Sequence, residues 1–227
     1  MTVTSTRPRT PRRTVRTLGV ALAGMVSVGT TGALVGVAAG SVSHNRMAPW
    51  IIGRAAGISA YLLLVALVLL GLLLAHPSRT RLRRPSSATR IRLHIVLSVL
   101  TLAVTVLHVI VLATDRFAGV GWWGVALPMR ASYRPVPVTL GVIGAWAGLI
   151  AGITAALAGH LPARAWWPVH KVAAVSLLLV WLHGVLAGGD THALRWIYLC
   201  TGLLVVLVAV SRYAARTPAD RVRELRQ

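Results

Sequence analysis

Long apolar stretches recur along the chain and constrain its fold more than any other feature. Each stretch is about 20 residues long, the length that an α-helix needs to cross the hydrocarbon core of a bilayer. Apolar residues make up 56% of the 227 residues and charged residues only 12%, and the mean hydropathy is +0.73. A soluble core of this size cannot bury so much apolar surface. The sequence therefore predicts an all-α protein, a polytopic membrane helical bundle of about six transmembrane helices.

Six stretches are long enough to span a membrane. They lie at 18–40, 50–75, 91–114, 138–158, 167–186 and 194–212. We expect a disordered basic cytoplasmic segment at 1–17, a transmembrane domain at 18–213 with its core at 50–213, and a cytoplasmic tail at 214–227. The connection at 115–137 is rich in aromatic residues and proline and is expected to be ordered. Because arginines precede the first stretch and small residues end it, a cleaved export signal is the alternative to a retained helix there.

Arginines are concentrated in alternate connections between the apolar stretches. The formal net charge of +20 would suggest nucleic-acid binding in a soluble protein. Here the arginines are better explained as topology signals, because basic connections stay in the cytoplasm. Both termini are therefore predicted to be cytoplasmic, and the stretches at 91–114 and 167–186 cross the membrane in the same direction. A single cysteine, Cys200, excludes an intramolecular disulfide and a Cys-x-x-Cys motif.

Four histidines lie within two of the predicted membrane helices. His94 and His108 are 14 residues apart in one helix, and His170 and His183 are 13 residues apart in the other. At about 1.5 Å per residue, each helix carries two imidazoles roughly 20 Å apart along its axis. Because the two helices run in the same direction, the histidines form one pair near the inner face and one near the outer face. Each pair can clamp an iron between two neutral imidazole nitrogens, as b-type haem sites do.

Other roles for intramembrane histidines stay open at this point. A single histidine can simply hydrogen-bond to a neighbouring helix, and a row of histidines can form a proton relay. Proton relays usually include acidic groups, and no Asp or Glu lies within a predicted membrane core. A zinc site needs ligands clustered within a few ångströms, unlike histidines separated by most of a bilayer.

The spacing of the second histidine pair raises a geometric difficulty. On a regular helix, a spacing of 13 leaves His183 about 140° around the axis from His170. The interval from Lys171 to Leu182 contains no Pro or Gly that would bend the helix. The sequence alone does not explain how both rings face the same partner helix.

Ten residues together resemble the pattern of a known membrane family. They are Trp50, Arg54, Gly57, Tyr61, His94, His108, Trp167, His170, Lys171 and His183. The pattern is similar to the ferric reductase-like transmembrane domain, a membrane haem module shared by ferric reductases, NADPH oxidases and the haem subunit of bacterial methionine sulfoxide reductase systems. The resemblance covers residues 50–213, and the two histidine spacings are its most specific part. It implies two haem b groups, one bound by His94 with His170 and the other by His108 with His183.

The resemblance also implies a function. A cytochrome b of this kind passes electrons across the membrane to an outward acceptor, either ferric iron or a redox partner protein. The sequence contains no Gly-rich dinucleotide loop, so we expect an oxidoreductase component with a separate reductase or a membrane quinol as electron donor. We expect a multi-pass protein of the bacterial plasma membrane, with the lipid bilayer as a partner and no nucleic acid. The alternative is a histidine-relay proton channel or transporter without haem.

Arg54 completes the predicted site. It lies about one turn into its helix, where an unpaired charge in lipid costs roughly 3 kcal/mol. We therefore expect Arg54 to bind an anion, with the propionates of the outer haem as the leading candidate and snorkelling to the membrane surface as the alternative. In the outer loop, Arg130, Tyr133 and Arg134 could do the same, bind an acceptor or be ordinary loop residues. No residue is predicted to be catalytic.

Overall fold

A computed structural model describes residues 47–77 and 86–215 of the chain. The chain divides into two units, residues 1–48 and 49–227, and the architecture below belongs to the second. The described ranges contain helices and no β-strand, so the all-α prediction is confirmed. The helices are α2 (Ala48–Ala75), α3 (Ser87–Thr114), α4 (Gly121–Ala126), α5 (Pro135–Ala156), α6 (Ala163–His170), α7 (Val172–Ala187) and α8 (Thr191–Ala214).

Five segments of the described ranges are long and apolar enough to cross a membrane. They agree with five of the six predicted spans, and the remaining predicted span, at 18–40, lies outside the described residues. Many large apolar side chains on these helices are exposed, for example Val99 and Leu203, each at 61%. In lipid such side chains face acyl chains, so their exposure carries no penalty. The chain is therefore a multi-pass membrane protein.

Local signals fix where two of these helices begin. The hydroxyl of Ser86 accepts a hydrogen bond from the backbone N–H of Thr89 at 3.2 Å, which caps α3. As a result α3 begins four residues before the predicted start at Ile91 and takes Arg90 into its first turn. α5 begins at Pro135, where the fixed φ of proline suits the first helical position.

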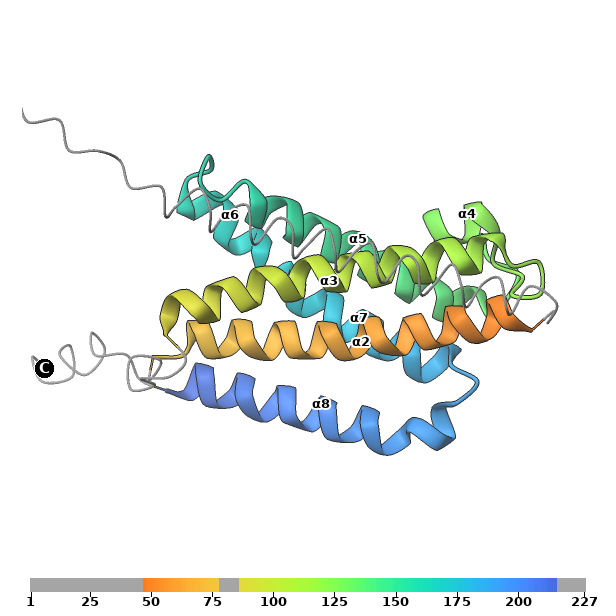
Figure 1. Ribbon diagram of the computed structural model, residues 1–227. Coiled ribbons are helices and arrows are strands. Elements are labelled where there is room, and N and C mark those ends of the chain that lie inside the picture. Colours follow the sequence, from red (N-terminus) through yellow and green to blue (C-terminus); the bar gives the residue numbers. More distant parts are fainter. Residues whose placement is uncertain (1–46, 78–85, 216–227) are drawn as a thin grey trace, which may run out of the picture. The chain divides into compact units, whose positions relative to one another are not determined.

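Specific contacts join neighbouring helices. α5 makes its most extensive contact with α7, and Ser176 on α7 donates a hydrogen bond to the carbonyl of Gly144 on α5 at 2.7 Å. Tyr61 on α2 hydrogen-bonds with Thr201 on α8. Figure 1 shows α4 and α6 at opposite ends of the helices, with the first turn of α3 and the last turn of α8 at the α6 end.

The fifth predicted span is divided at Lys171. The N–H of Lys171 donates to the carbonyl of Pro168 at 3.2 Å, and the N–H of Ala174 donates to the carbonyl of Lys171 at 3.0 Å. Both are bonds to the third residue back, so the chain winds more tightly there than an α-helix. Pro168 contributes because it lacks an N–H and its ring crowds the carbonyl of Arg164. The continuous helix expected over 167–186 is instead α6 followed by α7.

The connection at 115–137 is ordered, as its composition predicted. It contains α4, and its last residues cap the C-terminus of α7. The hydroxyl of Tyr133 donates to the carbonyl of Ala187 at 3.0 Å, and Arg134 donates to the carbonyl of Leu186 at 2.7 Å. These bonds satisfy carbonyls that have no partner within the helix, and they place a positive charge at the negative end of its dipole.

Candidate functional site

The structure brings the four predicted histidines together as two pairs. The ring centroids of His94 and His170 are 6.3 Å apart, and those of His108 and His183 are 6.5 Å apart. Two imidazoles on opposite sides of one metal have centroids about 6.2 Å apart, since each metal–nitrogen bond is about 2 Å and each nitrogen lies about 1.1 Å from its centroid. Each pair therefore leaves the spacing that one metal atom needs between two nitrogen ligands.

The tight turn at Lys171 contributes to the pairing of His170 and His183 with histidines of α3. Residues joined by hydrogen bonds to the third residue back turn about 120° each, against about 100° in an α-helix. Over the few residues of this turn, the extra rotation is roughly 60–80°, about half of the offset of about 140° on a regular helix. The overwinding beside Pro168 therefore brings His183 closer to the side of the span that holds His170.

Three of the four histidines donate an Nδ1–H to a backbone carbonyl on a neighbouring helix. A carbonyl oxygen can only accept, so the hydrogen is on Nδ1 and the lone pair of the neutral ring is on Nε2. Metal-binding histidines use this arrangement, because the second hydrogen bond fixes the tautomer and orients the ring. The distances are 2.6 Å from His108 to Gly53, 2.8 Å from His183 to Pro137 and 3.3 Å from His170 to Ala151.

The His94–His170 pair differs from the other pair in its surroundings. Nδ1 of His94 is buried and faces the backbone of Leu67 on α2, although no hydrogen bond of normal geometry forms. The ring of His170 lies 5.7 Å from Trp166 and 6.4 Å from Trp167, centroid to centroid. Trp167 is 42% exposed, so aromatic rings connect this pair to the surface of the protein.

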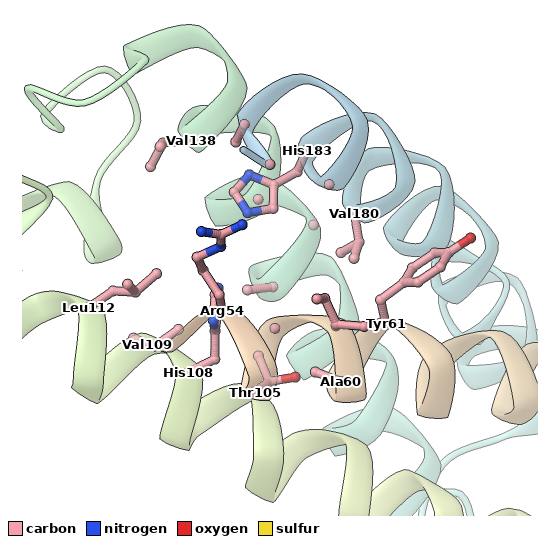
Figure 2. A pocket seen from close by; sticks show the side chains of 18 of the residues that line it. Arg54, Ala60, Tyr61, Thr105, His108, Val109, Leu112, Val138, Val180 and His183 are labelled. Atoms are coloured by element: carbon pink, nitrogen blue, oxygen red, sulfur yellow. The ribbon is translucent and has the colours of Figure 1, made fainter. Parts of the chain in front are cut away.

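A cavity of about 220 Å³ reaches the His108–His183 pair, and its walls come from α2, α3, α5, α7 and α8. Figure 2 shows the two histidines entering it from different helices. Most of the lining is apolar. The hydroxyls of Thr101, Thr105 and Ser176 also line it, but each donates to a backbone carbonyl of its own helix or of α5. The cavity therefore suits a mostly apolar ligand.

Arg54 lies in the lining of the same cavity, and it does have an anionic partner. Its guanidinium forms an ion pair with the carboxylate of Asp190, which immediately precedes α8. The guanidinium carbon also lies 5.6 Å from the ring centroid of Trp50. The sequence predicted an anion for Arg54 but did not identify Asp190. Both side chains are partly exposed, at 32% and 46%, so the pair lies at the open end of the cavity.

Two of the three residues that the sequence placed in an outer loop have structural partners. Tyr133 and Arg134 donate hydrogen bonds to the carbonyls at the end of α7. Arg130 is exposed.

The carbonyl acceptors of the histidines were not predicted from the sequence. Side-chain patterns do not identify backbone acceptors, since every residue carries a carbonyl.

Each histidine pair offers only two ligands to a metal. In the described residues, no group of three or more His, Cys, Asp and Glu side chains could hold a metal ion. A metal between two of these imidazoles would therefore need its remaining ligands from a bound cofactor.

Comparisons of the chain with known protein families, curated proteins and solved structures find no match. The functional argument therefore depends on the geometry of the two histidine pairs.

Proposed function

We propose that the chain is a transmembrane b-type cytochrome that passes electrons across the membrane through two bis-histidine haems. His94 with His170 would hold one haem iron, and His108 with His183 the other. The observation that carries this proposal is the spacing of the two ring pairs, 6.3 and 6.5 Å between centroids. A haem supplies four ligands to its own iron, so two imidazoles complete the coordination.

The surroundings of the histidines support haem over a free metal ion. A tetrahedral zinc site in a protein usually draws three or four ligands from side chains, whereas each pair here offers two. The apolar cavity at His108 and His183 matches the apolar faces of a porphyrin. Arg54 stands at the open end of that cavity, where it would pair with a propionate in place of, or together with, Asp190.

The placement of the two pairs along the helices supports transfer across the membrane. His94 and His108 are separated by 14 residues of α3, or about 21 Å along its axis. When bound, haem iron accepts and releases one electron at a time. The histidines would orient the two haems, and the apolar lining would keep water away from the inner part of the cavity. Two haems would divide one long electron transfer across the membrane into shorter transfers.

The resemblance to the ferric reductase-like domain suggests the classes of electron donor and acceptor. We expect a separate reductase or a membrane quinol to supply electrons, and ferric iron or a redox partner protein outside to receive them. On this proposal the chain is an oxidoreductase component of the bacterial plasma membrane. Basic connections then place both termini in the cytoplasm, and Trp166 and Trp167 lie beside the inner haem.

Single alanine variants of the four histidines test the proposal. The purified wild-type protein should contain about two haems per chain by pyridine haemochromogen assay. Each variant should keep about one, and the two members of a pair should lose the same haem, identified by its spectrum and midpoint potential. His76→Ala and His192→Ala are matched controls from outside the pairs and should keep both. Retention of both haems in all four variants would refute the assignment of ligands.

The alternative function is a histidine-relay proton channel or transporter without haem. A relay passes protons between ring nitrogens, but three of the Nδ1 atoms here are committed to backbone carbonyls. Proton flux into liposomes that contain colourless protein from haem-replete cells would favour this alternative over the cytochrome.

A further inference from the structure

Two glycines of α2 lie directly against the rings of the α3 histidines. A Cβ added to Gly57 would lie 2.7 Å from Cε1 and 2.9 Å from Nδ1 of His108. A Cβ added to Gly71 would lie 3.2 Å from Cε1 of His94. Carbon atoms in van der Waals contact are about 3.5–4 Å apart. Both histidine rings therefore occupy space that a side chain on α2 would fill.

The same arrangement occurs on α5. A Cβ added to Gly141 would lie 2.8 Å from Nδ1 and 2.9 Å from Cε1 of His183. The carbonyl that accepts the hydrogen bond of this ring belongs to Pro137, one helical turn before Gly141. On α2, His108 likewise bonds to the carbonyl of Gly53, one turn before Gly57.

A common unit thus recurs at three histidines. We call it a histidine seat, defined as a glycine under the ring together with the backbone four residues earlier, which faces Nδ1. The seats are Gly53 with Gly57 for His108, Leu67 with Gly71 for His94, and Pro137 with Gly141 for His183.

The two seats on α2 have the same spacing as the histidines that they face. Gly57 and Gly71 are 14 residues apart, as are His94 and His108. The order is reversed because α2 and α3 run antiparallel: the earlier glycine faces the later histidine. This matched spacing is readable in the sequence and is the signal that could have identified the glycines.

We infer that Gly57, Gly71 and Gly141 are positioning residues that set the orientation of three haem-binding imidazoles. The inference rests on the proposed function. A methyl group at one of these positions must push the ring away from its seat, which tilts Nε2 and weakens the Nδ1–H bond to the carbonyl. The expected consequence is loss of that imidazole from the iron, which leaves one coordination position open.

Carbon monoxide binding reports an open position directly. Ferrous haem with two histidine ligands has no free site for carbon monoxide, whereas haem that has lost one ligand binds it. In the Gly57→Ala and Gly141→Ala proteins, roughly half of the haem should bind carbon monoxide, against almost none in the wild type. In the Gly71→Ala protein, a smaller fraction of the haem held by His94 and His170 should bind carbon monoxide. The added methyl group needs to displace the His94 ring by only a few tenths of an ångström.

Gly202→Ala is the control, a glycine within α8 that contacts none of the four histidines. A Cβ there would lie 3.4 Å from Nε1 of Trp181, which is ordinary van der Waals contact. Its haems should remain closed to carbon monoxide. If the Gly57→Ala protein does not accumulate while the Gly202→Ala protein does, the Gly141→Ala and Gly71→Ala proteins decide the outcome by the same assay.

The experiment distinguishes failure of the proposed function from failure of the positioning role of the glycines. A wild-type protein without haem would overturn the proposed function. A wild-type protein with about two haems that are closed to carbon monoxide, together with glycine variants that behave like Gly202→Ala, would overturn the positioning role alone. Carbon monoxide binding in the glycine variants, with the control closed, would support it.

Discussion

His170 ends α6, His183 lies within α7, and the tight turn between them directs both rings toward α3. The turn is built from two hydrogen bonds to the third residue back, which involve Pro168, Lys171 and Ala174. A regular helix of the same length would direct the two rings to different sides. The pairing of the histidines therefore depends on an irregularity of the backbone.

Replacing Pro168 should disturb the His94–His170 pair, the inner pair of the proposed function, and spare the His108–His183 pair. Pro168→Ala restores an N–H that can bond to the carbonyl of Arg164, so the helix should become more regular and rotate His170 away from His94. The inner haem should then become high-spin or bind carbon monoxide, as measured by absorption spectra of the purified protein. Pro162→Ala is the control, because Pro162 lies at the N-cap of α6, outside the helix interior. An unchanged inner haem in Pro168→Ala would show that other contacts maintain the turn.

Arg54 and Asp190 should shift the midpoint potential of the outer haem in opposite directions. Arg54→Gln removes a positive charge near the haem and favours the ferric form, so the potential should fall. Asp190→Asn removes a negative charge, so the potential should rise. Both shifts should be modest, because the pair is partly exposed and screened by solvent. Redox titration measures them.

Arg195→Gln is the control for this pair of variants. Arg195 hydrogen-bonds to His192 and lies over Trp196, and it does not line the cavity that Arg54 and Asp190 line. Its replacement should leave both potentials unchanged. Shifts of the same sign in Arg54→Gln and Asp190→Asn would contradict the electrostatic role assigned to Arg54.

Tyr133 should contribute to stability through the cap on α7. Tyr133→Phe keeps the ring but removes the hydrogen bond to the carbonyl of Ala187, which should cost about 1 kcal/mol in the free energy of unfolding. Thermal unfolding in detergent should show a lower midpoint, with the haem content retained. Tyr213→Phe makes the same chemical change at a residue that is 74% exposed and should have no measurable effect. Equal midpoints for both variants would mean that the cap is not stabilising.

The predictable features of this fold are those that depend on side-chain pattern. Apolar length identified the five described spans, and the common direction of two of them predicted that the histidines would lie at matched heights. The break at Lys171 was missed because its cause, Pro168, precedes His170 and lies outside the interval between the two histidines. The partner of Arg54 was missed because Asp190 is distant in sequence and meets it only through the packing of the helices.

Backbone acceptors form the largest part of the site that the sequence did not indicate. The carbonyls that fix His108 and His183 belong to Gly53 and Pro137, whose side chains carry no polar group. Their role follows from the packing of the histidine rings against Gly57 on α2 and Gly141 on α5. The spacing of Gly57 and Gly71 on α2, which matches that of His94 and His108, is the feature of the sequence that reflects this packing.

The haem content of the intact protein tests the central claim most directly. The chain should be purified in detergent from haem-replete cells and analysed for iron and for its dithionite-reduced spectrum. The account predicts a sharp α-band and about two low-spin haems per chain. Well-folded protein that contains no iron and shows no such band would contradict it.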